Sequence, residues 1–558
     1  MEQIKDAIKA AVKELFGIDI EPELTRPDEQ FGDYATNVAL QLAGKLNQDS
    51  KEIAQAICQH VKGSTSHIKD IQMAGPGFIN IHLSDTALWE LTEAKSKQSL
   101  KGKTVVAEYS DPNPFKVLHA GHLYTSVVGD AIANLLEAAG AEVHRVNFGG
   151  DVGLHVAKTM WAILKNLGYF ATNGHSKKIE DIPKNERAEW LSEQYIEGTN
   201  AYDNDAEAKE LILELNHRVY DLHPKEPNKD IEFAHIYWTT REWSYEYFNQ
   251  FYTLIGTKFE KYYPESEVAE LGITTVKEHI QKGVFEESEG AIVFKGESYG
   301  LHTRVFINKE GLPTYETKDV GLIFQKKKDY NFDISVVITG NEQEQYMQVV
   351  LKAVEQFAPD LVHATKHLTH GIVKLKGGVK MSSRKGNILR AVDVLSAAEE
   401  ANKKATGKKD NSVVLGAVKY AFLKQRTGGD IIYNPSESVA LEGNSGPYLQ
   451  YAHARARSIL SKVDVKGSTS HTLEGDERSL LRKIGQYNEV VEQATSELMP
   501  HHICTYLYEL AQTFNRFYEQ NRVVGDEREQ LRARLVQKYA DTLKSGLKLL
   551  GIVAPEKM

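Results

Sequence analysis

The chain has 558 residues, of which 41% are hydrophobic and 26% charged, and its formal net charge is −10. This composition predicts a globular protein of roughly two to four domains. No apolar run of about eighteen residues occurs, which excludes a membrane-spanning helix. The two cysteines, Cys58 and Cys504, are too few for a disulfide framework, and the acidic balance argues against non-specific coating of nucleic acid. Because the N-terminus reads as an amphipathic helix and not as a signal peptide, we expect a cytoplasmic protein.

Residues 1–98 predict a first domain of the α+β class. Helical segments come first, and residues 71–83 end in an alternation of apolar and polar side chains that is typical of a half-buried strand. Phe78 and Asn80 are two positions apart in this strand, so their side chains point to the same face. By themselves, these residues are better explained by a core phenylalanine and a turn asparagine. The polar residues 96–103 predict a linker.

A strand–helix–strand unit follows the linker. Residues 104–109 predict a short buried strand, apolar residues at helical spacing predict a helix that Gly140 ends, and residues 142–148 predict the next strand. The segment Ser110–His122, S-D-P-N-P-F-K-V-L-H-A-G-H, therefore lies where the first strand leads into the helix. A helix N-terminus has unpaired N–H groups and a partial positive charge, so it attracts phosphate.

His119, Gly121 and His122 occupy the first turn of that helix. Two imidazoles on one face can donate hydrogen bonds to phosphate oxygens, and the glycine between them leaves room for a flat base. The alternative is a pair of ordinary capping histidines, which the strand–turn–helix context disfavours. Residues 147–155 add a glycine-rich segment at the carboxyl end of the second strand, where open parallel sheets bind ligands.

Residues near 156–300 predict a helical insertion that is rich in tryptophan and tyrosine. We assign no chemistry to it, because aromatic side chains at helical spacing usually belong to a core. The sheet is expected to resume with the apolar residues 320–324 and then with 333–340, a continuous apolar run typical of a buried parallel strand. An amphipathic helix at 343–357 and a strand candidate at 367–374 complete the alternation. We therefore expect a doubly wound, Rossmann-like α/β domain in the middle of the chain.

A basic loop follows at Lys374–Asn387, where glycines and serines separate five cationic side chains. Glycines give such a loop conformational freedom, and serines and cations can surround polyphosphate. A solvated basic loop, or a nucleic-acid patch, explains these residues equally well when they are taken alone.

The last third of the chain predicts a helical bundle. In the segment Gly446–Ile459, the side chains of Tyr448, Tyr451 and Arg455 recur on successive turns of one helix face. Exposed tyrosines beside arginines suit the splayed bases and phosphates of a folded RNA. A bundle with a charged outer face explains these residues slightly better when no other information is used.

Taken together, these motifs resemble those of the class I aminoacyl-tRNA synthetases, and specifically the arginyl-tRNA synthetase family. His119-Ala-Gly-His122 resembles the "HIGH" element of the class, and Lys380-Met-Ser-Ser-Arg384 resembles its "KMSKS" loop. Further segments are typical of the arginyl family, and the resemblance covers nearly the whole chain. These segments are 108–116, 314–320, 446–453 and 554–558.

The resemblance implies an N-terminal RNA-binding domain at 1–98, a Rossmann-like catalytic domain with an insertion at 102–395, and a helical anticodon-binding domain at 396–558. It also implies a reaction in which ATP and L-arginine give arginyl-adenylate, after which arginine passes to the terminal adenosine of tRNA-Arg. In this family the first step usually requires bound tRNA. Mg²⁺ is expected to arrive with ATP rather than at a dedicated metal site, and a monomer is the family expectation.

The resemblance implies roles for individual residues. A planar guanidinium with five donors requires carboxylates in a forked arrangement, which the single ammonium of lysine cannot bridge in the same way. Tyr315 and Asp319 are implied at the guanidinium, and Glu108 and Asn113 at the head or stem of the amino acid. The full set implied in arginine binding is Glu108, Ser110, Asn113, His119, Tyr315, Asp319 and Gln348.

The remaining implied roles concern phosphate and tRNA. The residues implied in catalysis are Lys116, His119, His122 and Lys380. Those implied in ATP binding are His119, Gly121, His122, Lys380, Met381, Ser382, Ser383, Arg384 and Lys385. Those implied in tRNA binding are Phe78 and Asn80 at the D-loop elbow, and Tyr448, Tyr451, Arg455 and Met558 at the anticodon.

Ser383 departs from the family motif, because it replaces the second lysine of the loop. The division of work among Lys116, Lys380 and Lys385 therefore stays open. Three other functions are alternatives: a class I lysyl enzyme, an inactive tRNA-binding paralogue and a small-molecule nucleotidyltransferase. The acidic pocket counts against the first, the intact motif residues against the second, and the long helical C-terminal part against the third.

Overall fold

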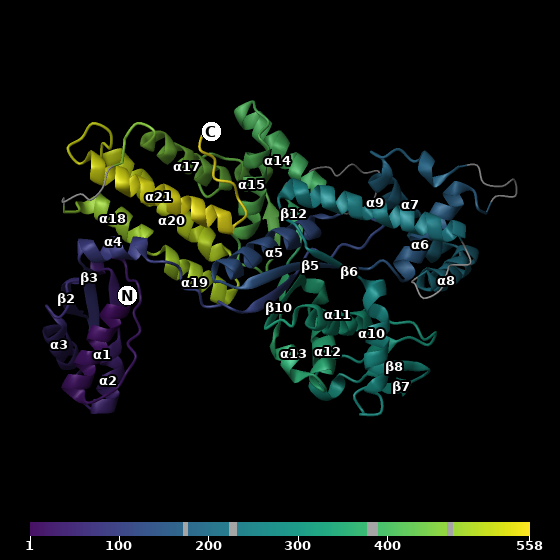
Figure 1. Cartoon of the computed structure of the whole chain (residues 1–558), viewed down its shortest axis with the longest axis horizontal. Helices are drawn as coiled ribbons and strands as arrows, with labels where there is room; N and C mark the ends of the chain where they lie inside the picture. The colour runs from purple at the N-terminus through teal and green to yellow at the C-terminus, as the bar shows by residue number, and fades with distance from the viewer. Residues whose placement is uncertain (171–176, 223–230, 377–388, 466–471) are drawn as a thin grey trace.

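The computed structural model describes residues 1–170, 177–222, 231–376, 389–465 and 472–558. Within these residues the chain forms an N-terminal unit, a central parallel sheet with its covering helices, and a C-terminal helical bundle (Figure 1). No helix in this part of the chain is long and apolar enough to cross a membrane. Short 3-10 helices occur at Glu29–Phe31, Ile179–Asp181, Glu297–Tyr299 and Asn341–Gln343.

The N-terminal unit packs helices against a three-stranded antiparallel sheet in the order β1-β3-β2, as the α+β prediction required. Phe78 and Asn80 lie on one face of β3, while Ile79 and Ile81 are fully buried on the other, which confirms the predicted alternation. Its elements are α1 (Glu2–Phe16), β1 (Tyr34–Thr36), α2 (Val38–Leu46), α3 (Ser50–Val61), β2 (Ile68–Ala74), β3 (Phe78–Leu83) and α4 (Asp85–Glu93).

The central sheet has five strands in the order β11-β10-β4-β5-β6, and every neighbouring pair is parallel. After β4 the chain forms β5 and β6 on one side of that strand, and it later forms β10 and β11 on the other side. This reversal of the strand order leaves a crevice at the carboxyl ends of β4 and β10. Helix α5 (Ala120–Ala138) connects β4 and β5. The strands are β4 (Thr104–Glu108), β5 (Glu142–Gly149), β6 (Lys261–Pro264), β10 (Ile334–Gly340) and β11 (Thr365–His370). The predicted Rossmann-like fold class is confirmed.

The predicted insertion is helical only in its first part. Strand β6 lies within the range 156–300 and belongs to the main sheet, and a small antiparallel sheet β7-β8-β9 follows it. β6 escaped prediction because it is a four-residue edge strand that ends in Pro264, a residue that edge strands tolerate and that lowers the strand signal. The elements are α6 (Leu154–Leu167), α7 (Arg187–Asn204), α8 (Ala206–Asp221), α9 (Ile231–Ile255), α10 (Glu265–Glu278), β7 (Glu286–Ser288), β8 (Ala291–Phe294) and β9 (Arg304–Ile307).

Residues 320–324, which we expected to form a strand, belong to helix α11 (Tyr315–Tyr330). This helix is buried continuously from Glu316 to Ile323, so it lacks the one-sided apolar pattern that identifies a helix, and a short apolar run cannot distinguish helix from strand. The predicted helix at 343–357 is confirmed as α12 (Glu344–Glu355), and α13 (Pro359–His363) follows it. The strand candidate at 367–374 divides into β11 and β12 (Val373–Leu375).

The C-terminal bundle is helical, as predicted, apart from β13 (Ile431–Tyr433), which pairs with β12. A domain boundary between residues 395 and 396 would cut the continuous helix α14, so the division does not fall there. The helices are α14 (Ala391–Thr406), α15 (Asn411–Leu423), α16 (Pro435–Ser438), α17 (Gly446–Leu460), α18 (Gly475–Ile484), α19 (Tyr487–Glu497), α20 (His501–Gln520) and α21 (Glu529–Leu549).

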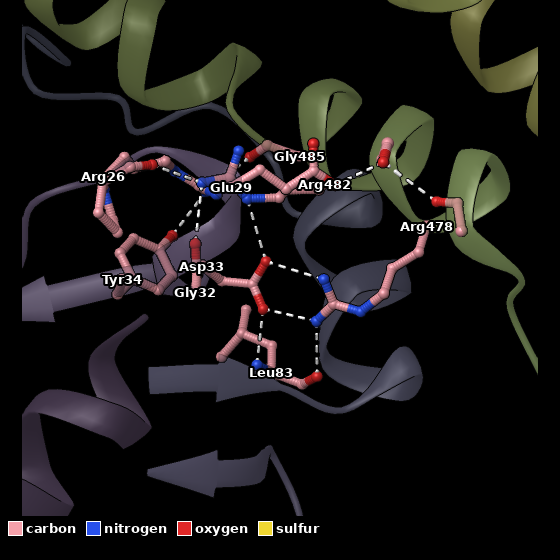
Figure 2. Close-up of polar contacts among 12 residues, drawn as sticks. Arg26, Glu29, Gly32, Asp33, Tyr34, Leu83, Arg478, Arg482 and Gly485 are labelled. Atoms are coloured by element: carbon pink, nitrogen blue, oxygen red, sulfur yellow. Dashed lines mark hydrogen bonds and ion pairs between the residues drawn. The ribbon is translucent and has the colours of Figure 1, made fainter. Parts of the chain in front are cut away.

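A buried carboxylate joins the N-terminal unit to the bundle (Figure 2). Asp33 is fully buried and accepts hydrogen bonds from both Nη atoms of Arg478, at 3.2 and 2.6 Å, while Nε of Arg482 lies 3.2 Å from its Oδ1. The amide of Leu83 donates to Oδ2 at 2.7 Å. Burial alone would raise the pKa of Asp33, but the hydrogen bonds from Arg478 and Leu83 outweigh it and lower the pKa.

A second polar cluster at this interface surrounds Arg26. Its Nε and Nη2 donate to the two oxygens of Glu489 on α19, each at 2.8 Å, and Nη2 also donates to the hydroxyl of Tyr34 at 2.7 Å. The contact between the first and last parts of the chain is thus built from ion pairs that are removed from water, which is costly unless each charge is matched.

Replacing Asp33 by asparagine should loosen this interface. Arg478 and Arg482 would stay largely buried without a counter-ion, which costs about 3–5 kcal/mol. We expect a lower Tm and faster tryptic cleavage within the linker at 96–103, measured on the full chain.

Asp19→Asn is a matched control, because Asp19 is exposed and lies 3.7 Å from its partner Lys9. Because the folded pKa of Asp33 is lowered, its contribution is present above the ordinary aspartate pKa of about 3.9 and is lost as the pH falls through the lowered value. Wild-type stability and cleavage in Asp33→Asn would show that the interface does not depend on this carboxylate.

Candidate active site

A cleft of about 610 Å³ opens at the carboxyl ends of the parallel strands, beside the point where β4 and β10 diverge. This is the position at which open α/β sheets bind ligands. Residues at the ends of four of the five strands line it. They include Glu108 at the end of β4 and Ser110 just after it, Phe148 to Gly150 at β5, Thr339 and Gly340 of β10, and His370 of β11.

The two predicted histidines lie at the N-terminus of α5 and line the cleft. Nδ1 of His119 accepts from the amide of Gly121, and Nδ1 of His122 accepts from the amide of His119, both at 3.1 Å. The rings are stacked with centroids 3.7 Å apart. Since each Nδ1 is an acceptor, the proton of each neutral ring is on Nε2, which is left as a donor.

Burial in the cleft favours the neutral form of both histidines. Burial lowers the pKa of His119 to about 4, helped by the charge of Lys116. Burial also lowers the pKa of His122, and the neighbouring His119 adds to the effect. Gly121 serves a different purpose from the one expected, because a Cβ there would lie 2.8 Å from Cε1 of His119. The room that the glycine leaves is filled by the His119 ring and not kept for a base.

Lys116 contributes a positive charge to the same side of the cleft. Its side chain is half-buried, and Nζ lies 5.4 Å from the ring centroid of Tyr195. Among the described residues, no carboxylate lies within 4.0 Å of Nζ, and burial lowers the pKa of the ammonium. A cation that is desolvated and has no anionic partner is well suited to bind phosphate.

The residues that flank the basic loop are attached to the histidine turn. The amide of Ala120 donates to the carbonyl of Leu389 at 2.7 Å, and the amide of Ala391 donates to the carbonyl of Leu118 at 2.9 Å. Val373, before the loop, and Leu389, after it, both line the cleft. The loop residues themselves lie outside the described residues; they are Lys380, Met381, Ser382, Ser383, Arg384 and Lys385.

The opposite wall of the cleft is acidic. Glu108 is buried and ion-paired with Lys326 of α11, whose Nζ also donates to Oγ of Ser335 at 3.2 Å. Glu265 at the start of α10 is ion-paired with the buried Lys318 in the same way. Sequence analysis missed both lysines, because lysine is rarely buried unless it is paired.

Asp319 is buried in this wall and accepts a hydrogen bond from the hydroxyl of Tyr346. Burial raises the pKa of Asp319 to about 8, and the charges of Glu108 and Glu265 add to the rise despite the hydrogen bond from Tyr346. Among the described residues, no basic group lies within 4.0 Å of its carboxylate. The empty cleft therefore holds an acid that a bound cation would stabilise in its charged form.

Tyr315 and Asn113 lie at the edges of this wall. Nε2 of His155 donates to the carbonyl of Gly150 at 2.8 Å, so its Nδ1 accepts from the Tyr315 hydroxyl at 3.3 Å, and the lone pairs of the hydroxyl stay available. The amide of Gly150 donates to Oδ1 of Asn113 at 2.8 Å, which leaves Nδ2 as a donor. The hydroxyl of Ser110, by contrast, is engaged with Tyr252 and Ser126.

The expectation for Gln348 is wrong. Its side chain is exposed on α12, and it is not among the described residues that line the cleft. Gln343, Tyr346 and Met347 line it instead, because positions three and four apart share one face of a helix and position 348 falls on the next face. The glutamine of this wall is therefore Gln343.

The residues expected to bind tRNA lie away from the cleft. Phe78 is 41% exposed on the N-terminal sheet, and Tyr451 is 44% exposed on α17. Tyr448 is half-buried, and its hydroxyl accepts from Nδ2 of Asn515 at 2.8 Å. The guanidinium of Arg455 stacks on the ring of Tyr518, at 4.6 Å.

The end of the chain lies against α17. Glu556 pairs with Arg457 at 2.6 Å, and the carbonyl of Pro555 accepts from Nδ1 of His453 at 2.8 Å. Met558, two residues further, is 49% exposed.

Removing the buried partner of Glu108 should destabilise the catalytic sheet. Lys326→Met leaves a carboxylate buried without compensation, so we expect a loss of about 3–5 kcal/mol in the free energy of unfolding, measured by urea denaturation. The double variant Lys326→Met/Glu108→Gln should recover part of the loss, because no charge is then left unpaired. Lys328→Met, on the exposed side of α11, is the control and should change little. Equal stabilities for Lys326→Met and Lys328→Met would contradict a structural role for the pair.

Three family models match consecutive parts of the chain. The model for the catalytic domain of class I tRNA synthetases (R) matches residues 86–434, the arginyl tRNA synthetase N terminal domain matches residues 2–83, and the DALR anticodon binding domain matches residues 449–558. The catalytic match ends at residue 434, after β13, which agrees with the pairing of β13 with β12.

Whole-chain relatives are found among curated proteins and solved structures. The arginine–tRNA ligase of Bdellovibrio bacteriovorus is 30% identical, over 100% of this chain and 98% of its own length. That of Flavobacterium psychrophilum is 29% identical, over 100% of this chain and 99% of its own length.

The arginyl-tRNA synthetase structures of Thermus thermophilus and Plasmodium falciparum share the fold. The Thermus structure has a TM-score of 0.79 at 24% identity, and the match covers 100% of both chains. The Plasmodium structure has a TM-score of 0.78 at 21% identity, and the match covers 100% of this chain and 99% of that one. From the family models and the curated relatives together, the chain belongs to the arginyl-tRNA synthetase family of class I aminoacyl-tRNA synthetases.

Proposed function

We propose that the chain is an arginine–tRNA ligase that activates L-arginine with ATP in the cleft and transfers it to the terminal adenosine of tRNA-Arg. One observation carries this proposal: His119 and His122, at a helix N-terminus, and the carboxylates of Glu108 and Asp319 line the same cavity. Phosphate and a cationic amino acid can therefore bind side by side. The curated relatives that span the whole chain are named arginine–tRNA ligases.

The acidic wall is the proposed arginine pocket. The guanidinium would lie between Asp319 and the hydroxyl of Tyr315, which offer acceptors on two sides to a planar group with five donors. A bound guanidinium is always charged, so it would return the raised pKa of Asp319 towards its ordinary range. Lysine presents a compact ammonium that would leave some of these acceptors unpaired, and unpaired buried polar groups reject a wrong substrate strongly.

The histidine side of the cleft is the proposed phosphate site. The carboxylate of arginine attacks the α-phosphate of ATP in line, a new C–O–P bond forms, and pyrophosphate leaves. The Nε2–H donors of His119 and His122 and the ammonium of Lys116 would stabilise the charge that develops on the phosphate oxygens. No covalent bond to the protein is required, so catalysis rests on positioning and on electrostatics.

Mg²⁺ would enter with ATP, whose phosphates supply most of its ligands. Among the described residues, no group of three or more His, Cys, Asp or Glu side chains is placed to hold a metal ion. The share of the phosphate-stabilising work that falls to Lys116, Lys380 and Lys385 stays a prediction, as do the monomeric state and the cytoplasmic location.

The proposed tRNA surface has two parts. Phe78 and Asn80 would meet the D-loop elbow from the N-terminal sheet, and Tyr451 and Arg455 would meet the anticodon from α17, with Met558 near them. Exposure supports Tyr451 as the stacking platform. Tyr448, which is half-buried and hydrogen-bonded to Asn515, would position α20 beside α17 rather than stack on a base.

His122→Ala should lower kcat by about 10²–10³, as expected when one donor to a transition state is lost. Arginine-dependent exchange of pyrophosphate into ATP, measured with tRNA present, is the assay, and lysine should not replace arginine. Affinity for tRNA should change little.

His122→Asn separates chemistry from helix capping, because its side-chain oxygen can still accept from the His119 amide. We expect it to be as slow as the alanine variant. Near-normal turnover of either variant would remove His122 from the mechanism. Exchange with lysine but not arginine in the wild type would overturn the substrate, and the absence of exchange alongside tight tRNA binding would favour the inactive paralogue.

Tyr451→Ala should weaken tRNA binding by about 1–3 kcal/mol, the typical value of one base–aromatic stack. Filter binding with tRNA-Arg measures the change, and the KM for arginine at saturating tRNA should stay the same. Tyr448→Phe, which removes only the hydroxyl that accepts from Asn515, is the control and should bind tRNA normally. If Tyr451→Ala abolished arginine activation at saturating tRNA, the assignment of α17 to RNA binding would be wrong.

A further inference from the structure

The arginine pocket contains more carboxylates than the lysines behind it can neutralise. Four acidic side chains line its inner part: Glu108, Asp111, Glu265 and Asp319; a fifth, Glu342, is exposed at the rim. Glu108 and Glu265 are each closed off by an ion pair to a buried lysine. Among the described residues, neither Asp111 nor Asp319 has a basic group within 4.0 Å.

Asp111 is held in a constrained conformation. Its φ is +49° and that of the preceding Ser110 is +78°, and both values lie in the left-handed region that L-residues seldom adopt. Oδ1 accepts from the amide of Phe148 at 2.8 Å, and no further hydrogen bond to the carboxylate is found in the described part of the chain. Ser110 is fixed by its hydrogen bonds to Tyr252 and Ser126. Strain of this kind persists where the surroundings impose it, often at a site of function.

The position of Asp111 relates it to one end of the substrate. It lies on the same loop as Lys116 and His119, whereas Asp319 belongs to helix α11. L-arginine has two positive groups, the guanidinium and the α-ammonium. Its carboxylate must reach the α-phosphate beside the histidines, and the α-ammonium is attached to the same carbon. The end of arginine that lies near this loop is therefore the α-amino acid end.

We propose that Asp111 is the counter-ion of the α-ammonium of L-arginine, while Glu108 serves as the internal partner of Lys326. The inference rests on the proposed function and assigns one residue within it. Asp111 and Asp319, which have no basic group within 4.0 Å among the described residues, then match the two positive charges of the substrate.

The electrostatics of the empty cleft agree with this assignment. Burial raises the pKa of Asp111, and the charges of Glu108 and Asp319 raise it further. An ammonium within hydrogen-bonding distance would reverse this effect and favour the charged carboxylate. Binding a cation there relieves repulsion among the acids, which adds to selectivity for a doubly positive ligand.

The test compares two ligands that differ only in the α-ammonium. L-arginine carries it, and 5-guanidinopentanoate lacks it. Both are measured as inhibitors or substrates of tRNA-dependent pyrophosphate exchange, in the wild type and in Asp111→Asn. The asparagine keeps Oδ1 as an acceptor for the Phe148 amide, so the loop should stay folded, which the Tm of the variant checks.

In Asp111→Asn we expect the KM for arginine to rise about 10- to 100-fold, because a charged hydrogen bond is lost, while the inhibition constant of 5-guanidinopentanoate changes less than about threefold. Asp319→Asn, at the guanidinium end, should weaken both ligands. An equal loss for both ligands in Asp111→Asn, or no loss for either, would overturn the proposal. If the wild type showed no arginine-dependent exchange, the proposed function itself would be overturned. That result differs from one in which the wild type is active and only the role of Asp111 is contradicted.

Discussion

The buried ion pair between Glu108 and Lys326 is the contact on which the architecture of the cleft depends. It joins the end of β4 to α11, and through Ser335 it includes β10, so three elements that flank the divergence of the sheet are fixed by one ammonium. A buried ion pair stabilises the fold little more than an apolar contact of equal size, but removing one partner leaves a buried charge that destabilises the fold strongly. The relative positions of β4, β10 and α11 are therefore set by charge as well as by packing.

This constraint divides the cleft into two sides of opposite character. On one side, neutral imidazoles at a helix N-terminus offer donors beside Lys116, which has no carboxylate within 4.0 Å among the described residues. On the other, carboxylates outnumber the lysines that neutralise them. Both sides disfavour the charged form of their own groups: burial and like charge raise the pKa of Asp319, and burial lowers the pKa of His119. Substrates of opposite charge compensate both sides at once, so binding energy is gained where the protein alone carries a cost.

Much of this arrangement could be predicted from the sequence, because its signals are local. The strand–turn–helix context located His119 and His122, and alternation located β3, although Phe78 is exposed and not the core residue that the residues alone favoured. The failures have physical causes. β6 is a short edge strand that ends in proline, and α11 is buried over too many consecutive residues to show a helical stripe. The expectation for Gln348 failed because the resemblance indicated a glutamine in this region but not which helix position faces the cleft.

Long-range pairing is what the sequence could not supply. Sequence analysis assigned no role to Lys318 or Lys326, and only the folded structure reveals their partners Glu265 and Glu108. Asp111 was visible between Ser110 and Asn113, but its neighbours in space come from elsewhere, so its lack of a partner could not be inferred. The roles of Lys380 to Lys385 likewise rest on motif alone, since those residues lie outside the described part of the chain.

The clamp around Asp33 has a consequence for the order in which the protein is made. Asp33 and Arg478 are separated by 445 positions, so a ribosome has completed most of the chain before the arginine emerges. Until α18 is synthesised, the carboxylate of Asp33 lacks the two arginines that bind it in the folded chain. Docking of the first domain onto the last is thus a late event of biogenesis, and a chain truncated before α18 lacks both arginines that bind the Asp33 carboxylate.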